Sequence, residues 1–135
     1  MRVSTKGRYG LRSMVDLALH YDNGPVLLKD IAKRQEVSMK YLDHVIKPLR
    51  EKGYIERIKN GYMLSMPPEK ISCLEVLNAV EGSLAPVNCV DNTEYCTKRN
   101  TCPTINVWRE IKKSVEGVLK RKTLKDIAEK KEKPF

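Results

Sequence analysis

The sequence predicts a mostly α-helical protein with one small β-hairpin. Apolar residues recur at helical spacing over most of the 135 residues. One exception is a segment in which residues 54–58 alternate as a strand, Asn60-Gly61 is a two-residue turn signal, and residues 62–64 supply a return strand. The composition, with 6% aromatic and 32% charged residues, favours one soluble helical domain over a β-sandwich or a disordered tail.

Three helices are expected before the hairpin. The first spans residues 5–20, and a short second one runs from about Leu28 to Gln35. After a tight corner at residues 36–37, Ser38 is placed to cap a third helix over residues 39–52. Two short helices, a corner and a hairpin make a winged helix-turn-helix over residues 1–66, in which the second helix of the pair can enter a DNA major groove.

The charge balance favours a polyanionic partner. Lysine and arginine number 26 against 17 acidic residues, a net charge of +9, and residues 1–65 hold 13 basic and 7 acidic side chains. Charge alone is equally compatible with solvated helix faces. The N-terminus lacks a signal sequence, and no apolar run reaches the roughly 18 to 20 residues of a membrane span. We therefore expect a cytoplasmic protein with no membrane contact.

Residues 67–103 are expected to form a linker helix and a cysteine-bearing loop. Ser72 and Glu75 match a capping box, and no apolar period follows between residues 82 and 103. Cys89, Cys96 and Cys102 lie there with the spacing C-x6-C-x5-C. A disulfide is disfavoured in a reducing cytosol, zinc usually shows a closer cysteine pair, and an iron-sulfur cluster tolerates wider spacings. The residues alone leave the three alternatives open.

Residues 104–135 are expected to contain a helix of about five turns and a short last helix capped by Thr123. The long helix carries an apolar stripe, which we expect to pair with the same helix of a second subunit. The stripe consists of Trp108, Ile111, Val115, Val118 and Leu119. An enzyme is not expected, because the chain has two histidines, no Gly-rich phosphate loop and no recognisable nucleophile-base spacing.

Several segments together resemble the bacterial iron-sulfur cluster regulators of the IscR, NsrR and RirA type. They are MRVSTKGRY at residues 1–9, LKDIA at 28–32, SMKYL at 38–42, and the cysteine triplet followed by VWR at 107–109. The resemblance implies a homodimeric winged-helix transcription regulator, expected to be a repressor. It implies a [2Fe-2S] or [4Fe-4S] cluster held by Cys89, Cys96 and Cys102, which senses iron, redox state or nitric oxide. A cluster-free, thiol-based redox regulator of the same fold is the alternative, and an iron-sulfur carrier a less favoured one.

The chain departs from this family pattern at the expected fourth ligand. Ile105 stands where IscR-type members have a histidine, and Arg8 and Arg12 stand where some relatives supply a ligand from the other subunit. Asp91, Glu94, an external thiol or water are the remaining candidates.

The resemblance also places DNA contacts on the third helix and the wing. Ser38, Lys40 and Tyr41 have donors suited to phosphate oxygens, whereas Asp43 can accept from cytosine and His44 can donate to guanine. The alternative for His44 is an exposed residue that contacts no base. Lys59 lies where related wings carry an arginine for the minor groove. A two-fold dimer predicts a near-palindromic operator in double-stranded DNA.

Overall fold

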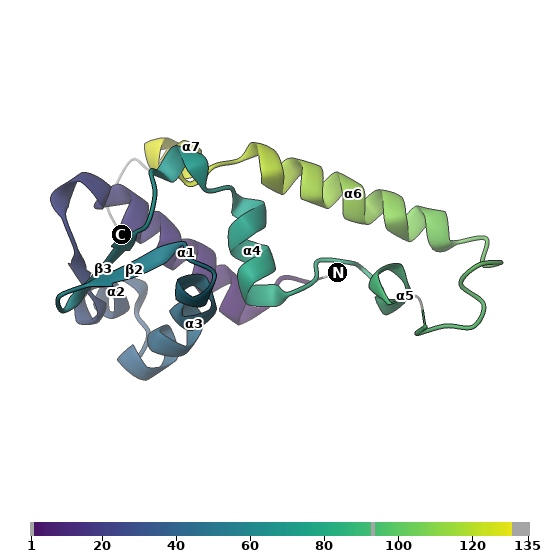
Figure 1. Ribbon diagram of the computed structural model, residues 1–135, viewed down its shortest axis with the longest axis horizontal. Coiled ribbons are helices and arrows are strands. Elements are labelled where there is room, and N and C mark those ends of the chain that lie inside the picture. The colour runs from purple at the N-terminus through teal and green to yellow at the C-terminus, as the bar shows by residue number, and fades with distance from the viewer. Residues whose placement is uncertain (1, 93, 131–135) are drawn as a thin grey trace.

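The computed structural model describes residues 2–92 and 94–130 and has the predicted winged helix-turn-helix at its N-terminal end (Figure 1). Its helices are α1 (Thr5–Leu19), α2 (Leu28–Gln35) and α3 (Met39–Glu51), followed by α4 (Cys73–Glu81), α5 (Asn88–Asp91), α6 (Ile105–Arg121) and α7 (Leu124–Lys130). Short 3-10 turns lie at Tyr21–Asn23 and Pro68–Lys70. The mostly helical fold class is thereby confirmed. No helix among the described residues is long and apolar enough to cross a membrane.

The sheet has one strand more than the sequence predicted. Strands β1 (Val26–Leu27), β2 (Ile55–Ile58) and β3 (Gly61–Leu64) form an antiparallel sheet in the order β1-β3-β2. With two residues, β1 is too short to show a periodic pattern, and its pairing with β3 is visible only in the folded chain.

The hairpin turn lies one residue earlier than predicted. Ile58 pairs with Gly61, so the turn residues are Lys59 and Asn60, and Lys59 has a positive φ of 55°. Gly61 is required for a different reason, because a Cβ there would lie 2.7 Å from the Cβ of Pro25. Without a side chain at Gly61, the segment that leads into β1 can pack closely against β3. The predicted position of the turn, at Asn60-Gly61, was therefore wrong by one residue.

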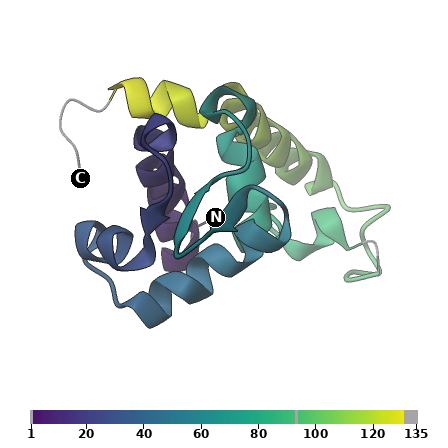
Figure 2. The same ribbon diagram turned by 60° about the vertical axis from the view of Figure 1, so that its left-hand side comes forward.

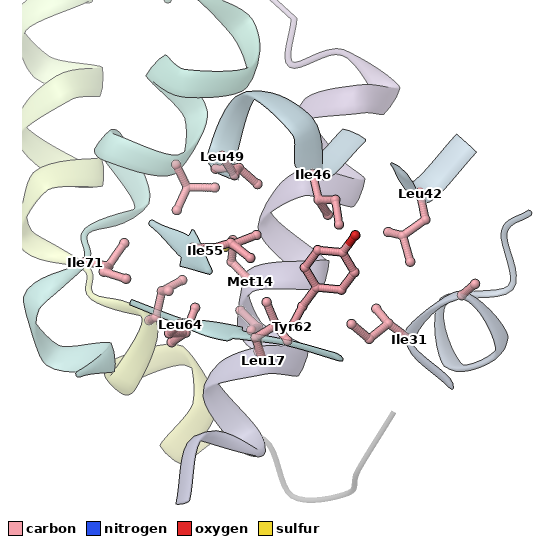
Figure 3. Close-up of a cluster of buried hydrophobic side chains, with 14 residues drawn as sticks. Met14, Leu17, Ile31, Leu42, Ile46, Leu49, Ile55, Tyr62, Leu64 and Ile71 are labelled. Carbon is pink, nitrogen blue, oxygen red and sulfur yellow. The ribbon is translucent and has the colours of Figure 1, made fainter. Parts of the chain in front are cut away.

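One hydrophobic core contains side chains from both the first helix and the last helix of the structure. Buried side chains from α1, α3 and the sheet point toward one another, among them Met14, Leu49 and Leu64 (Figure 3). Ile71 and Leu124 belong to the same cluster, and the N–H of Leu124 donates to the carbonyl of Ile71 at 2.9 Å. The chain after α6 therefore returns to the winged-helix core, where α7 packs against α1.

The winged helix-turn-helix and the loop between α5 and α6 lie toward opposite ends of the molecule. Figure 1 shows the sheet and α2 at one end, the loop between α5 and α6 at the other, and α6 running between them above α4. The turned view in Figure 2 places α2, α3 and the hairpin on one side of the molecule and α6 with the loop on the other. Between these two ends, α4 contacts α1, α3 and α6.

Candidate DNA-binding surface and cysteine loop

The helix-turn-helix corner is built by local backbone and side-chain bonds. Glu36 ends α2 in the left-handed conformation with φ of 57° and ψ of 45°, and the N–H of Val37 donates to the carbonyl of Ala32 at 3.0 Å. The hydroxyl of Ser38 then accepts from the N–H of Tyr41 at 3.0 Å. The predicted cap is confirmed, and it fixes where α3 begins.

The predicted DNA-contact residues of α3 lie outside the side of the helix that is packed in the core. Leu42, Val45, Ile46 and Leu49 are buried. Ser38, Lys40, Asp43 and His44 are exposed, and Lys40 and His44 share the outward side because they are four residues apart. Tyr41 is half-buried, and its ring meets that of Tyr9 edge-on with the centroids 5.9 Å apart. The outward side of α3 thus presents Lys40, His44 and Lys47 to solvent.

A buried ionic network that the sequence analysis missed holds α2 against α1. The Asp16 carboxylate is fully buried and accepts from Arg34 Nε at 2.9 Å and Arg34 Nη2 at 2.8 Å. Gln35 Nε2 donates to the same carboxylate at 3.0 Å, while Gln35 Oε1 accepts from Arg12 Nε at 2.8 Å. The bond to Asp16 raises the pKa of Arg34. An aspartate between the buried Val15 and Leu17 was the one sequence signal for such a network.

The wing presents basic side chains around a buried tyrosine. Tyr62 of β3 is 4% exposed, and the guanidinium carbons of Arg50 and Arg57 each lie 5.9 Å from its ring centroid. Arg50 Nη1 also donates to the Tyr62 hydroxyl at 3.2 Å. Lys59 is exposed at the hairpin turn. The side of the molecule that carries α3 and the hairpin therefore bears cations from both elements.

The cysteine loop is attached to its surroundings by a few polar contacts. Arg99 Nε donates to the carbonyl of Cys89 at 2.7 Å, which links α5 to the last part of the loop. Asp91 accepts from the Ser83 hydroxyl and forms an ion pair with Lys112 of α6 at 2.7 Å. Where the sequence predicted no regular structure, Cys89 lies in the single turn of α5. These contacts connect the loop to α6 near Cys89.

The three loop thiols are accessible but are not gathered into one ligand group. Cys89, Cys96 and Cys102 are half-buried free thiols, whereas Cys73 is a buried free thiol whose pKa is raised by burial, as expected for a packing residue. Within residues 2–92 and 94–130, no three His, Cys, Asp or Glu side chains stand close enough to hold a metal ion. Ile105, at the position of the absent histidine, is 6% exposed and is the buried residue of α6.

Cys102 lies among hydrogen-bond donors that favour its thiolate form. Its sulfur lies 3.1 Å from Thr104 Oγ1, at the start of α6. Hydrogen bonds from the Thr104 side chain and backbone and from the Ile105 backbone lower the pKa of Cys102. A lowered pKa enlarges the thiolate fraction near neutral pH, and the thiolate is the form that binds metals and reacts with oxidants.

The apolar stripe of α6 is only partly covered by its own chain. Ile111 and Val118 are 38% and 43% exposed, while Trp108, Val115 and Leu119 are half-buried on the helix that packs against α4 and α5. The stripe therefore has an inner part in contact with its own chain and an outer part in solvent.

Comparison with known proteins gives a consistent result. The Rrf2 family model, described as "Iron-dependent Transcriptional regulator", matches residues 3–130. The protein named rrf2 from Nitratidesulfovibrio vulgaris is 38% identical over 130 residues, which cover 94% of this chain and 87% of that protein. The structure of CymR, titled the global cysteine regulator of B. subtilis, superposes with a TM-score of 0.79 at 33% identity, covering 98% and 99% of the two chains. The IscR structure of T. potens gives 0.76 at 37% identity, covering 96% and 87%.

Proposed function

The chain belongs to the Rrf2 family of transcriptional regulators, and from this premise we propose that it is a repressor whose DNA binding is controlled by its three-cysteine loop. Regulators of this family bind DNA and act as dimers, and they are not enzymes. The observation that carries the proposal is the position of an activated, accessible thiol, Cys102, directly before the helix with the exposed apolar stripe.

DNA recognition is assigned to the outward side of α3 and to the wing. Ser38, Lys40 and Tyr41 would contact phosphates, Asp43 and His44 would contact base edges, and Lys59 would follow the backbone or the minor groove. The exposure of Lys40, Asp43, His44 and Lys59 supports this assignment, as does the rigid cap at Ser38. Tyr41 is assigned a phosphate contact through its hydroxyl, since its ring is occupied by Tyr9.

The outer part of the α6 stripe is assigned to the subunit interface. Ile111 and Val118 are exposed in the single chain, and covering them with a second α6 would remove apolar surface from water. Trp108, Val115 and Leu119 would complete the interface from its inner edge. A two-fold axis at this helix would present two copies of α3 to a near-palindromic operator.

An iron-sulfur cluster is the favoured sensor because the donor set fits one. Cys89, Cys96 and Cys102 provide three free thiols on one loop, and the lowered pKa of Cys102 favours the ligating thiolate. The bound cluster would supply chemistry that responds to iron, redox state or nitric oxide. Since the described residues hold no group of three ligands, binding requires the loop to rearrange. Asp91 would transmit this rearrangement to α6 through its ion pair with Lys112.

A thiol-based redox regulator is the second candidate. The lowered pKa of Cys102 favours it, because a thiolate reacts with oxidants and this mechanism needs no group of three ligands. Its chemistry would be transfer of one oxygen from a peroxide, reduced to water or an alcohol, to the Cys102 thiolate to give the sulfenic acid. A second thiol would then attack the sulfenic sulfur, forming a disulfide and releasing water.

The deciding experiment is an ultraviolet-visible spectrum of anaerobically purified protein, followed by measurement of operator binding. A cluster predicts a coloured protein that loses its colour when Cys89, Cys96 or Cys102 is replaced by Ala, with Cys73→Ala as the matched control that keeps it. A colourless protein whose DNA binding changes on peroxide treatment, and no longer does so in Cys102→Ala, would replace the cluster with the thiol mechanism. Identical DNA binding by wild type and the triple Cys→Ala variant would remove the sensor altogether.

A further inference from the structure

Two exposed apolar side chains border a small hollow beside the proposed DNA-binding helix. The hollow has a volume of about 310 Å³ and lies between the start of α2, the start of α3 and the hairpin. Leu27, Leu28 and Lys29 line one side, Met39 another, and Arg57 and Asn60 the wing side. Met39 is 51% exposed and Leu27 is 38% exposed. One exposed apolar residue would need no explanation, but two beside the same hollow form a local apolar surface.

Met39 lies on the side of α3 that faces the wing. It precedes the buried Leu42 by three residues and the exposed Asp43 by four, so it stands between the packed side of the helix and Asp43. Tyr41 lies on the opposite side, against Tyr9 of α1. Met39 is also the first residue after the Ser38 cap, and residues at the N-terminal end of a recognition helix are those that reach base edges.

The charges around the hollow favour nucleic acid over a protein partner with a basic surface. Among the described residues that line it, the charged side chains are Lys29 and Arg57, both cations. Lys40 and Lys59 are exposed on the adjoining parts of α3 and the hairpin turn. An apolar centre with a cationic border matches a DNA groove, in which phosphates flank the base edges.

The major groove offers one apolar group for such a surface to contact. Thymine carries a C5-methyl group there, and no other base does. Methionine is unbranched and polarizable, so it can adapt to a methyl group at a variable distance. We propose that Met39 contacts a thymine C5-methyl group in each operator half-site and so selects a T·A pair at that position. This inference rests on the proposed placement of α3 in the major groove.

Deoxyuridine tests the contact, because it differs from thymidine only by the methyl group. An operator is first selected from a randomised library with the wild-type dimer, and each thymine of a half-site is then replaced by deoxyuridine in turn. One replacement should weaken wild-type binding by a factor of roughly two to five, the effect of removing one buried methyl group. The same replacement should leave the Kd of Met39→Ala unchanged, and Met39→Leu should retain most of the sensitivity.

The outcomes separate this inference from the proposed function. Alanine and leucine are both good helix formers, so α3 should remain folded in both variants, and circular dichroism checks this. Failure of the wild type to select any DNA would overturn the proposed function itself. A selected operator without a fixed thymine, or equal deoxyuridine effects in wild type and Met39→Ala, would overturn the role of Met39 and leave DNA binding intact. A uniform loss of affinity in Met39→Ala would assign the residue to packing and would likewise overturn its role as a base reader.

Discussion

The carboxylate of Glu81, the last residue of α4, accepts hydrogen bonds from both the backbone N–H and the hydroxyl of Ser4, the N-cap of α1. The distance from Ser4 N to Glu81 Oε1 is 2.9 Å. The cysteine loop begins at the next residue, Gly82, and α1 carries the Tyr9 ring that meets Tyr41 of α3. The contact therefore joins the start of the loop to the helix-turn-helix by a route that does not involve α6.

A double-mutant cycle should reveal this contact in the stability of the protein. A Cβ at Gly7 would collide with Glu81 Oε1, so Gly7→Ala should displace the carboxylate from Ser4 and destabilise the wild type by about 1 kcal/mol. In the Glu81→Ala background only the exposed Val3 side chain, whose Cγ1 lies 3.0 Å from the added Cβ, must still move, so the same change should stabilise the protein by up to roughly 1 kcal/mol because alanine is the better helix former. Urea unfolding measures both values. The exposed Glu69→Ala serves as a control and should stay within about 0.5 kcal/mol of wild type.

Thiol alkylation should be fastest at Cys102 and depend on Thr104. Because hydrogen bonds lower the pKa of Cys102, its thiolate should persist to lower pH than that of an ordinary cysteine. Thr104→Val removes the hydroxyl at nearly constant shape and should move the midpoint of iodoacetamide labelling to higher pH. Cys73 should remain unlabelled in the native protein, since burial raises its pKa. Mass spectrometry across a pH series reports each site, and equal rates at Cys96 and Cys102 would contradict the assignment.

Dimerisation should be lost in Val118→Glu without loss of folding. Val118 is 43% exposed in the single chain, so a carboxylate there remains solvated in the monomer. In a paired α6 the same carboxylate would be buried in an apolar contact, which costs several kcal/mol. Sedimentation at micromolar concentration should show a dimer for wild type and for the exposed control Lys113→Glu, and a monomer for Val118→Glu. A dimeric Val118→Glu would place the interface elsewhere.

Lys40→Ala and His44→Ala should weaken DNA binding in different ways. Removal of one phosphate contact at Lys40 should lower affinity for all sequences and reduce the slope of log K against log salt by about 1. His44→Ala should instead change preference at one base pair, by about 1 to 3 kcal/mol if the imidazole donates to guanine. Titrations at several salt concentrations with matched and mismatched operators separate the two effects. If His44→Ala changed the affinity for all sequences equally, His44 would be an exposed residue that contacts no base.

The sequence by itself determined the helices other than α5 and the presence of the hairpin, since these depend on residues close together in the chain, but it did not determine β1 or the exact position of the hairpin turn. Ser38, Ser72 and Thr123 each bond to a backbone N–H three residues later, as their sequence context predicted. The buried side of α3 likewise follows from its period. The sequence also identified Cys89, Cys96 and Cys102 as three thiols on one loop.

Only the tertiary structure decided the contacts between residues far apart in the chain. Ser4 and Glu81 are 77 residues apart, and Asp16 and Arg34 are 18 apart, so no local pattern could pair them. Glycine is a residue type typical of turns, but at position 61 the close approach of Pro25 is what excludes a side chain. The loop shows the same limit: its spacing left a disulfide, zinc and a cluster open, and among the described residues its three thiols form no common ligand group. Spacing along a chain restricts distance in space only within a few residues, and beyond that the packing of the whole core decides which groups meet.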